Sequence, residues 1–174
     1  AGLSLHAQTG AITGTPASLQ APGTYTVTAS NAAGSASTQV RLTITSRGSW
    51  TSVPPISPGR HYLSLSRLAD GKVLAAGGIT AGGVTASAAL YDPATDTWTP
   101  AASMLSARYE HTATVLADGR VLVAGGQPSA SVSTASAEIY DPVSNTWTAA
   151  ASMSEARVRS TANLLADGTV LVIG

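Results

Sequence analysis

Short apolar runs separated by turn residues dominate the chain from about residue 57 onward. The stretch from His111 to Tyr140 shows the pattern, because two such runs flank Asp118-Gly119 and a third follows after a polar loop. Runs of this length bounded by Gly, Asp and Pro are typical of β-strands, and an Asp-Gly pair between two of them predicts a tight hairpin. We therefore expect an all-β structure with no helix longer than a turn.

The same pattern recurs with a period of nearly 50 residues. Trp50, Trp98 and Trp147 lie 48 and then 49 residues apart, and the Asp-Gly pairs and double glycines repeat with them. Each period holds four strands, the last of them around the tryptophan. A repeat of this length, built from one small sheet that cannot bury its faces alone, predicts the blade of a β-propeller.

Variation between the repeats is confined to one end of the predicted sheet. The Asp-Gly and Asp-Pro turns keep their length, whereas the loop of residues 79–85 is one residue shorter than the loop of residues 127–134. In an up-and-down sheet, these loops share one end with the crossings between blades. Insertions on one face often mark the binding face of a repeat protein.

Residues 1–47 follow a different pattern. They contain no acidic residue, and apolar positions alternate with period two along Tyr25–Ala29 and Val40–Ile44. Alternation with Gly and Asn turns predicts part of a β-sandwich. The run from Gly2 to Val27 resembles the immunoglobulin-like domains of bacterial secreted and surface proteins, so we expect residues 1–47 to be the C-terminal half of such a domain.

From Trp50 onward the chain resembles the kelch family. The resemblance rests on Met104-x-x-x-Arg108, the pair Gly125-Gly126, Tyr140 and Trp147. It implies a propeller of six or seven blades, of which residues 48–174 would be a part, with further blades after Gly174. The expected parts are an outer strand at 48–56, blades at about 57–104 and 105–153, and a partial blade at 154–174.

Composition and charge exclude several classes of partner. Charged residues make up 10% of the chain and the net charge is zero, so no basic surface for nucleic acid is predicted. No apolar run approaches the roughly 18 residues of a membrane span. Because the chain contains no cysteine, it offers neither disulfides nor thiolate metal ligands.

The sequence predicts no catalytic or metal site in this chain. The kelch resemblance extends to galactose and glyoxal oxidases, whose radical copper site uses a cysteine-linked tyrosine, a second tyrosine and histidines. His6, His61 and His111 show no ligand spacing, so copper would be a cofactor only if its ligands lay outside these residues. Asp92 and Asp141, each before a proline, are expected to cap turns rather than bind calcium.

Positions next to a recurrent arginine are the candidate binding residues. Arg60, Arg108 and Arg157 recur in every copy, which indicates a shared structural role in the crossing. Two places later the repeats differ, and the expected ligand-binding residues are Tyr62, Glu110 and Arg159, with Gln127 in the adjacent loop. The alternative is that these positions are exposed to solvent and vary in sequence without any functional role.

The expected function is that of a secreted or cell-surface bacterial protein whose propeller binds a protein or a glycan. One alternative makes these repeats the N-terminal blades of a radical copper oxidase of the galactose or glyoxal oxidase type. A second alternative makes them a structural spacer in an adhesin.

Overall fold

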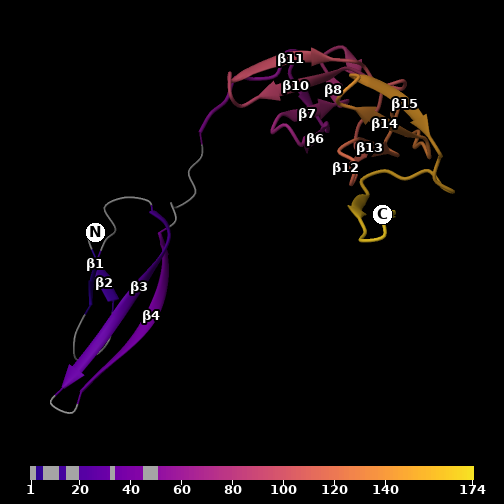
Figure 1. Ribbon diagram of the computed structural model, residues 1–174. Helices are drawn as coiled ribbons and strands as arrows, with labels where there is room; N and C mark the ends of the chain where they lie inside the picture. The colour runs from indigo at the N-terminus through magenta and orange to yellow at the C-terminus, as the bar shows by residue number, and fades with distance from the viewer. Residues whose placement is uncertain (1–2, 6–11, 15–19, 32–33, 45–50) are drawn as a thin grey trace. The chain divides into compact units, whose positions relative to one another are not determined.

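A computed structural model describes residues 51–174 in full, and the backbone of residues 3–5, 12–14, 20–31 and 34–44. The chain divides into two compact units, Ala1–Thr51 and Ser52–Gly174. All regular elements of the described residues are β-strands, as predicted (Figure 1). Within these residues there is consequently no helix long and apolar enough to cross a membrane.

The first unit contains two antiparallel hairpins. One joins β1 (Leu3–Leu5) to β2 (Ile12–Gly14), and the other joins β3 (Gln20–Asn31) to β4 (Gly34–Ile44). The register of the longer pair shifts between Gln20 and Gly23. Pro22 lies at this shift, and proline cannot donate a ladder hydrogen bond.

The second unit is a series of antiparallel sheets whose strands follow one another in chain order (Figure 1). The first sheet contains β6 (Ser64–Arg67), β7 (Val73–Ala76), β10 (Ala88–Asp92) and β11 (Thr97–Ala101). The second contains β12 (Thr112–Val115), β13 (Val121–Ala124), β14 (Ala137–Asp141) and β15 (Thr146–Ala150). A third begins with β16 (Thr161–Leu164) and β17 (Val170–Ile173).

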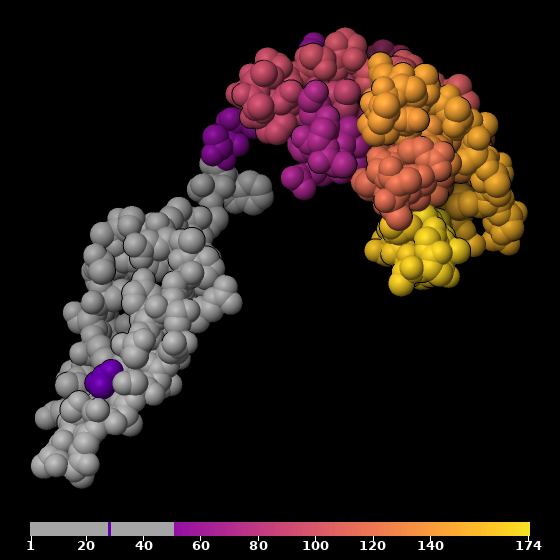
Figure 2. All heavy atoms as spheres, in the orientation of Figure 1, coloured from indigo at the N-terminus to yellow at the C-terminus, as the bar shows by residue number. Residues whose placement is uncertain are grey.

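These sheets are the blades of a partial β-propeller, which confirms the predicted fold class. The first strand of each blade is the innermost, and β12 lies beside both β6 and β16. The space-filling view shows the successive segments of residues 52–174 stacked in chain order (Figure 2).

The Asp-Gly turns are built identically in all three repeats. In the second repeat, Leu116 N donates to Arg120 O at 2.8 Å and Gly119 N donates to Leu116 O at 3.0 Å. Asp118 Oδ1 accepts from Arg120 N at 3.1 Å, and Gly119 has a φ of 86° that favours glycine. The same backbone bonds close the turns at 68–72 and 165–169. This end of the blades is therefore uniform.

The opposite end carries structure that the sequence did not predict. The loop of residues 79–85 forms a small hairpin of β8 (Ile79–Thr80) and β9 (Gly83–Val84), which pairs with β5 (Arg60–His61) in the crossing. In the second repeat, isolated bridges join Tyr109 to Gln127 and Ser129 to Val132. The variable loops are thus tied by their backbones to the crossings beside them.

The expected outer strand at 48–56 is described only from residue 51. Residues 51–56 have no strand structure, and 48–50 lie outside the described residues. Pro54 and Pro55 lack the N–H groups that a strand would donate. The outer strand stays a prediction.

The main core lies between the first two blades. It consists of Leu68, Leu74, Ala76, Ala88, Met104, Val121, Val123, Tyr140 and Trp147. Trp147 packs on Tyr140 with ring centroids 5.1 Å apart, and its Nε1 donates to Ala102 O at 2.8 Å. Trp98 makes the equivalent bond to Pro54 O at 2.9 Å. Each tryptophan therefore attaches its blade to the crossing that precedes it.

The double glycines sit where the next crossing approaches most closely. Gly78 N donates to Arg108 O at 2.9 Å, and Gly126 N donates to Arg157 O at 2.8 Å. A Cβ on Gly125 would lie 2.5 Å from Arg157 O, and the residue has a φ of 69°. Backbone approach between blades thus depends on the missing side chain.

Gly125→Ala should destabilise the protein far more than Gly119→Ala. Both glycines have positive φ, so each alanine incurs a backbone cost of roughly 1–2 kcal/mol. Only the Cβ at position 125 meets backbone, since nothing lies within 4 Å of position 119. Overpacking should add about 1–3 kcal/mol at position 125, measurable by urea unfolding. Equal losses in the two variants would contradict this account of the glycine pair.

Candidate functional site

Tyr62, Glu110 and Arg159 occupy equivalent places, each two residues before an innermost strand. Their φ angles are 56°, 53° and 55°. Residues other than glycine rarely adopt this left-handed backbone conformation. It carries a free-energy cost of order 1–3 kcal/mol and persists only where the surrounding structure holds it. Every described repeat thus keeps a large polar side chain at a position where glycine would be less strained.

Backbone hydrogen bonds join these three residues in a row. Glu110 N donates to Tyr62 O at 3.1 Å, and Arg159 N donates to Glu110 O at 3.1 Å. Each bond crosses from one repeat to the next. The structure therefore brings together three residues that lie nearly 50 positions apart in the sequence. Their role in ligand binding stays a prediction.

An ion pair fixes the charged members of the row. Arg159 Nε lies 2.9 Å from Glu110 Oε1, with the arginine side chain 76% exposed and the glutamate side chain 7% exposed. The hydrogen bond and the charge of Glu110 raise the pKa of Arg159. Glu110 Oε2 is buried and has no hydrogen-bond partner among the described residues. The pair therefore presents a positive head to solvent above a buried carboxylate.

Aromatic rings extend the row. Tyr62 is exposed, and its ring lies 4.8 Å from that of His61 and 6.2 Å from that of Tyr109 between centroids. Tyr109 also exchanges two backbone hydrogen bonds with Gln127, at 3.1 and 2.9 Å. Gln127 thus joins the other candidates through Tyr109. Sequence reasoning missed Tyr109. The equivalent positions of the other repeats hold His61 and Val158, so this position also varies from repeat to repeat.

The recurrent arginines have the structural role that was predicted. Arg108 is fully buried, and its Nη1 donates to Gly125 O at 2.9 Å and to Ser136 O at 3.0 Å. In each repeat, the arginine donates to the glycine 17 residues further on, Gly77 for Arg60 and Gly174 for Arg157. These side chains hold the crossing against its own blade.

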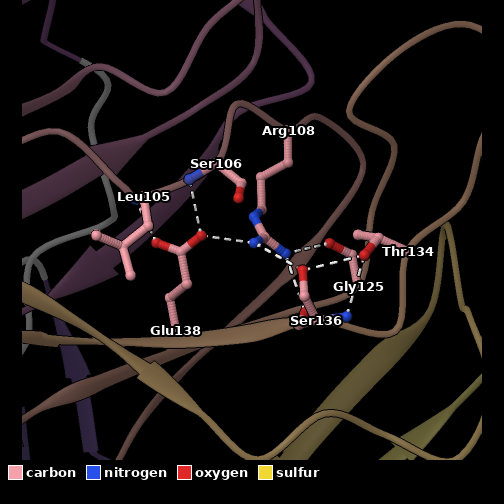
Figure 3. A network of polar contacts seen from close by, with 7 residues as sticks. All are labelled: Leu105, Ser106, Arg108, Gly125, Thr134, Ser136 and Glu138. Atoms are coloured by element: carbon pink, nitrogen blue, oxygen red, sulfur yellow. Dashed lines mark hydrogen bonds and ion pairs between the residues drawn. The ribbon is translucent and has the colours of Figure 1, made fainter.

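Glu138 is a second residue that sequence reasoning missed. Its Oε1 lies 2.7 Å from Arg108 Nη2, and the two side chains are 3% and 0% exposed (Figure 3). Its two oxygens also accept from the backbone N–H groups of Leu105 and Ser106. The available signal was a charged residue with apolar residues on both sides of it in the strand, which has to be paired when buried.

The aspartates before prolines cap turns, as predicted. Asp92 Oδ1 accepts from Ala94 N at 2.9 Å, and Asp141 Oδ1 accepts from Val143 N at 2.8 Å. Asp96 accepts from the hydroxyl of Tyr91 at 2.6 Å. Across the described part of the chain, no three His, Asp or Glu side chains gather as a metal site would require.

His111 directly precedes the innermost strand β12 and contacts the preceding blade. Its Nε2 is 2.8 Å from Ser64 Oγ in the preceding blade, and its Nδ1 is buried without a partner among the described residues. Burial, and secondarily the charge of Arg108, lower the pKa of His111 to about 4. The imidazole is therefore neutral at physiological pH and packs as an interface residue.

Comparison with known proteins finds a family match for each part of the chain. Residues 68–105 and 107–154 match the family described as Kelch motif, and residues 1–46 match the family described as Putative Ig domain. No curated protein matches the chain. One similar solved structure is a fungal alcohol oxidase of the AA5 family in complex with copper, at 29% identity and a TM-score of 0.45. That match covers 52% of this chain and 18% of the oxidase chain.

Stability should fall in acid because of His111. Its folded pKa of about 4 lies below the unfolded value of 6.5, so the unfolded state binds the proton first. As the pH falls from about 6.5 to about 4, the free energy of unfolding should decrease by about 3 kcal/mol from this group alone. Urea unfolding across this range measures the loss.

The variant His111→Ser, which carries the residue of the third repeat, should remove most of that dependence. If His111→Ser kept the full loss, another group would have to be responsible.

Proposed function

We propose that this chain, which carries two kelch repeats after an Ig-like domain, is a binding module for a protein or glycan partner. The proposed surface comprises Tyr62, Tyr109, Glu110, Gln127 and Arg159. The observation that carries the proposal is that three large polar side chains occupy left-handed backbone positions in one hydrogen-bonded row.

Backbone strain at equivalent positions favours a role for these side chains. A residue that served only to start the strand would be less costly as glycine, which adopts this conformation freely. The three repeats instead carry a phenol, a carboxylate and a guanidinium. Strained backbone positions are a recognised feature of ligand-binding sites.

The chemistry of the row suits contact with a macromolecule. Tyrosine and arginine are enriched among the residues that dominate binding energy at interfaces. Here Glu110 holds the guanidinium of Arg159 at 2.9 Å, so less side-chain freedom would be lost on binding. We expect a partner with an acidic group for Arg159 and a flat apolar face for Tyr62. A peptide supplies both, and an acidic glycan is the alternative.

We further propose that the protein is secreted or surface-exposed and bacterial. Support comes from the Ig-like match over residues 1–46, since domains of this architecture are common on cell surfaces. The copper oxidase and spacer alternatives stay predictions.

Arrays of immobilised peptides and of immobilised oligosaccharides would test the proposal and separate the two partner classes. The informative variant combines Tyr62→Gly, Glu110→Gly and Arg159→Gly, because glycine relieves the backbone strain while removing the side chains. We expect it to lose the selected ligand by at least about 10-fold and to keep or raise its melting temperature.

Asp118→Ala is the matched control at the opposite end of the blade. Loss of its turn bonds to Arg120 should lower the melting temperature and leave affinity unchanged. If the triple glycine variant kept its affinity and Asp118→Ala lost it, the binding surface would lie at the end of the Asp-Gly turns. That result would contradict the proposal.

A further inference from the structure

One buried position distinguishes the two complete blades. Glu138 on β14 lies two residues before Tyr140, and Ala89 on β10 lies two residues before Tyr91. Both occupy the same register: Ala89 pairs with Ala75 of β7, as Glu138 pairs with Val123 of β13. The first blade therefore has a methyl group where the second has a carboxylate.

In the second blade, that carboxylate completes a buried site. Its oxygens lie 2.7 Å from Arg108 Nη2, 2.6 Å from Leu105 N and 3.0 Å from Ser106 N (Figure 3). Arg108 and Glu138 are 0% and 2% exposed as residues. A buried guanidinium is costly without such a partner, so the carboxylate compensates the charge.

In the first blade, the arginine keeps its carbonyl bonds but lacks the anion. Arg60 Nη1 donates to Ser87 O at 2.9 Å and to Gly77 O at 3.4 Å, matching the bonds of Arg108. Among the described residues, no Asp or Glu forms an ion pair with it, and burial lowers the pKa of Arg60. Its positive charge is therefore partly desolvated and uncompensated.

An open cavity of about 660 Å³ lies beside Arg60. Its lining includes Arg60, Ala89 and Ser57, together with the apolar surfaces of Pro54 and Trp98. Ser57 stands at the position of Leu105, whose N–H binds Glu138 in the second blade, whereas Pro58 replaces the second donor, Ser106. In the second blade, the Glu138 carboxylate is bound by one guanidinium and two backbone N–H groups. The polar end of this cavity keeps the guanidinium and one of the two N–H positions.

We propose that this cavity binds a small monocarboxylate with an apolar body. The ligand carboxylate takes the place of the Glu138 carboxylate and pairs with Arg60, while its body lies against Trp98 and Pro54. Asp96 also lines the cavity, with its carboxylate accepting from the Tyr91 hydroxyl. That charge disfavours a second anionic group on the ligand, so the expected class is monocarboxylate rather than dicarboxylate.

Calorimetric titration of the chain with butyrate tests the site, and butyramide is the neutral control of the same shape. Butyrate should bind saturably, and butyramide at least about 10-fold more weakly, because it cannot pair with the guanidinium. Arg60→Gln should abolish the preference for butyrate. Equal binding of the two compounds, or no saturable butyrate binding, would overturn the proposal.

Ala89→Glu supplies the missing carboxylate from within the chain. This variant should lose butyrate binding and melt at a higher temperature, since it restores the pair seen in the second blade. Unchanged butyrate affinity in Ala89→Glu would show that the ligand sits elsewhere.

The reciprocal change, Glu138→Ala, should create a second site beside Arg108. The melting temperature should fall, and butyrate should raise it again while butyramide does not. If that variant fails to fold, Ala89→Glu still decides the question. These residues are separate from the surface proposed to bind a macromolecule, so either proposal can fail without the other.

Discussion

The arginine at each crossing connects two blades at once. The carbonyl of Arg108 accepts from Gly78 of the first blade, while its guanidinium donates to Gly125 of the second. Arg157 repeats both bonds, to Gly126 and Gly174. The crossing can approach only because the glycines lack a Cβ. The position and spacing of the blades therefore depend on this arginine, whose guanidinium is held by backbone carbonyl oxygens.

This constraint also shapes the proposed binding surface. Once the arginine is fixed, the chain must enter the innermost strand within a few residues, and it does so through a left-handed residue in all three repeats. The side chain there is displayed with the same backbone geometry each time. Chemistry can then vary from blade to blade without changing the framework, which is an advantage of repeat architectures.

The recurrent arginine has a different environment in each of the two complete blades. In the second blade a buried glutamate neutralises it, whereas in the first an alanine leaves a cavity beside it. A buried ion pair contributes little net stability, but removing one partner leaves a charge that still needs an anion. A single difference between repeats can thus leave the arginine without its ion-pair partner.

The sequence alone determined the features that depend on local bonds and on the period. These are the four-strand repeat, the Asp-Gly and Asp-Pro turns, the glycine pairs and the shared structural role of the arginines. Each follows from hydrogen bonds within a few residues, or from recurrence at equal spacing. Sequence reasoning also selected the varied positions Tyr62, Glu110 and Arg159, because they differ beside a residue that does not.

Only the tertiary structure decided how those residues meet. The ion pair of Glu110 with Arg159, the stacking of Tyr109, the loop hairpin against Arg60 and the contrast between Ala89 and Glu138 all join segments far apart in the chain. A period shows that two residues are equivalent, but it does not show which side chain of one repeat reaches the next. That depends on the distance between blades, which is set by the apolar core between them and by the backbone bonds from the glycine pairs to the crossings.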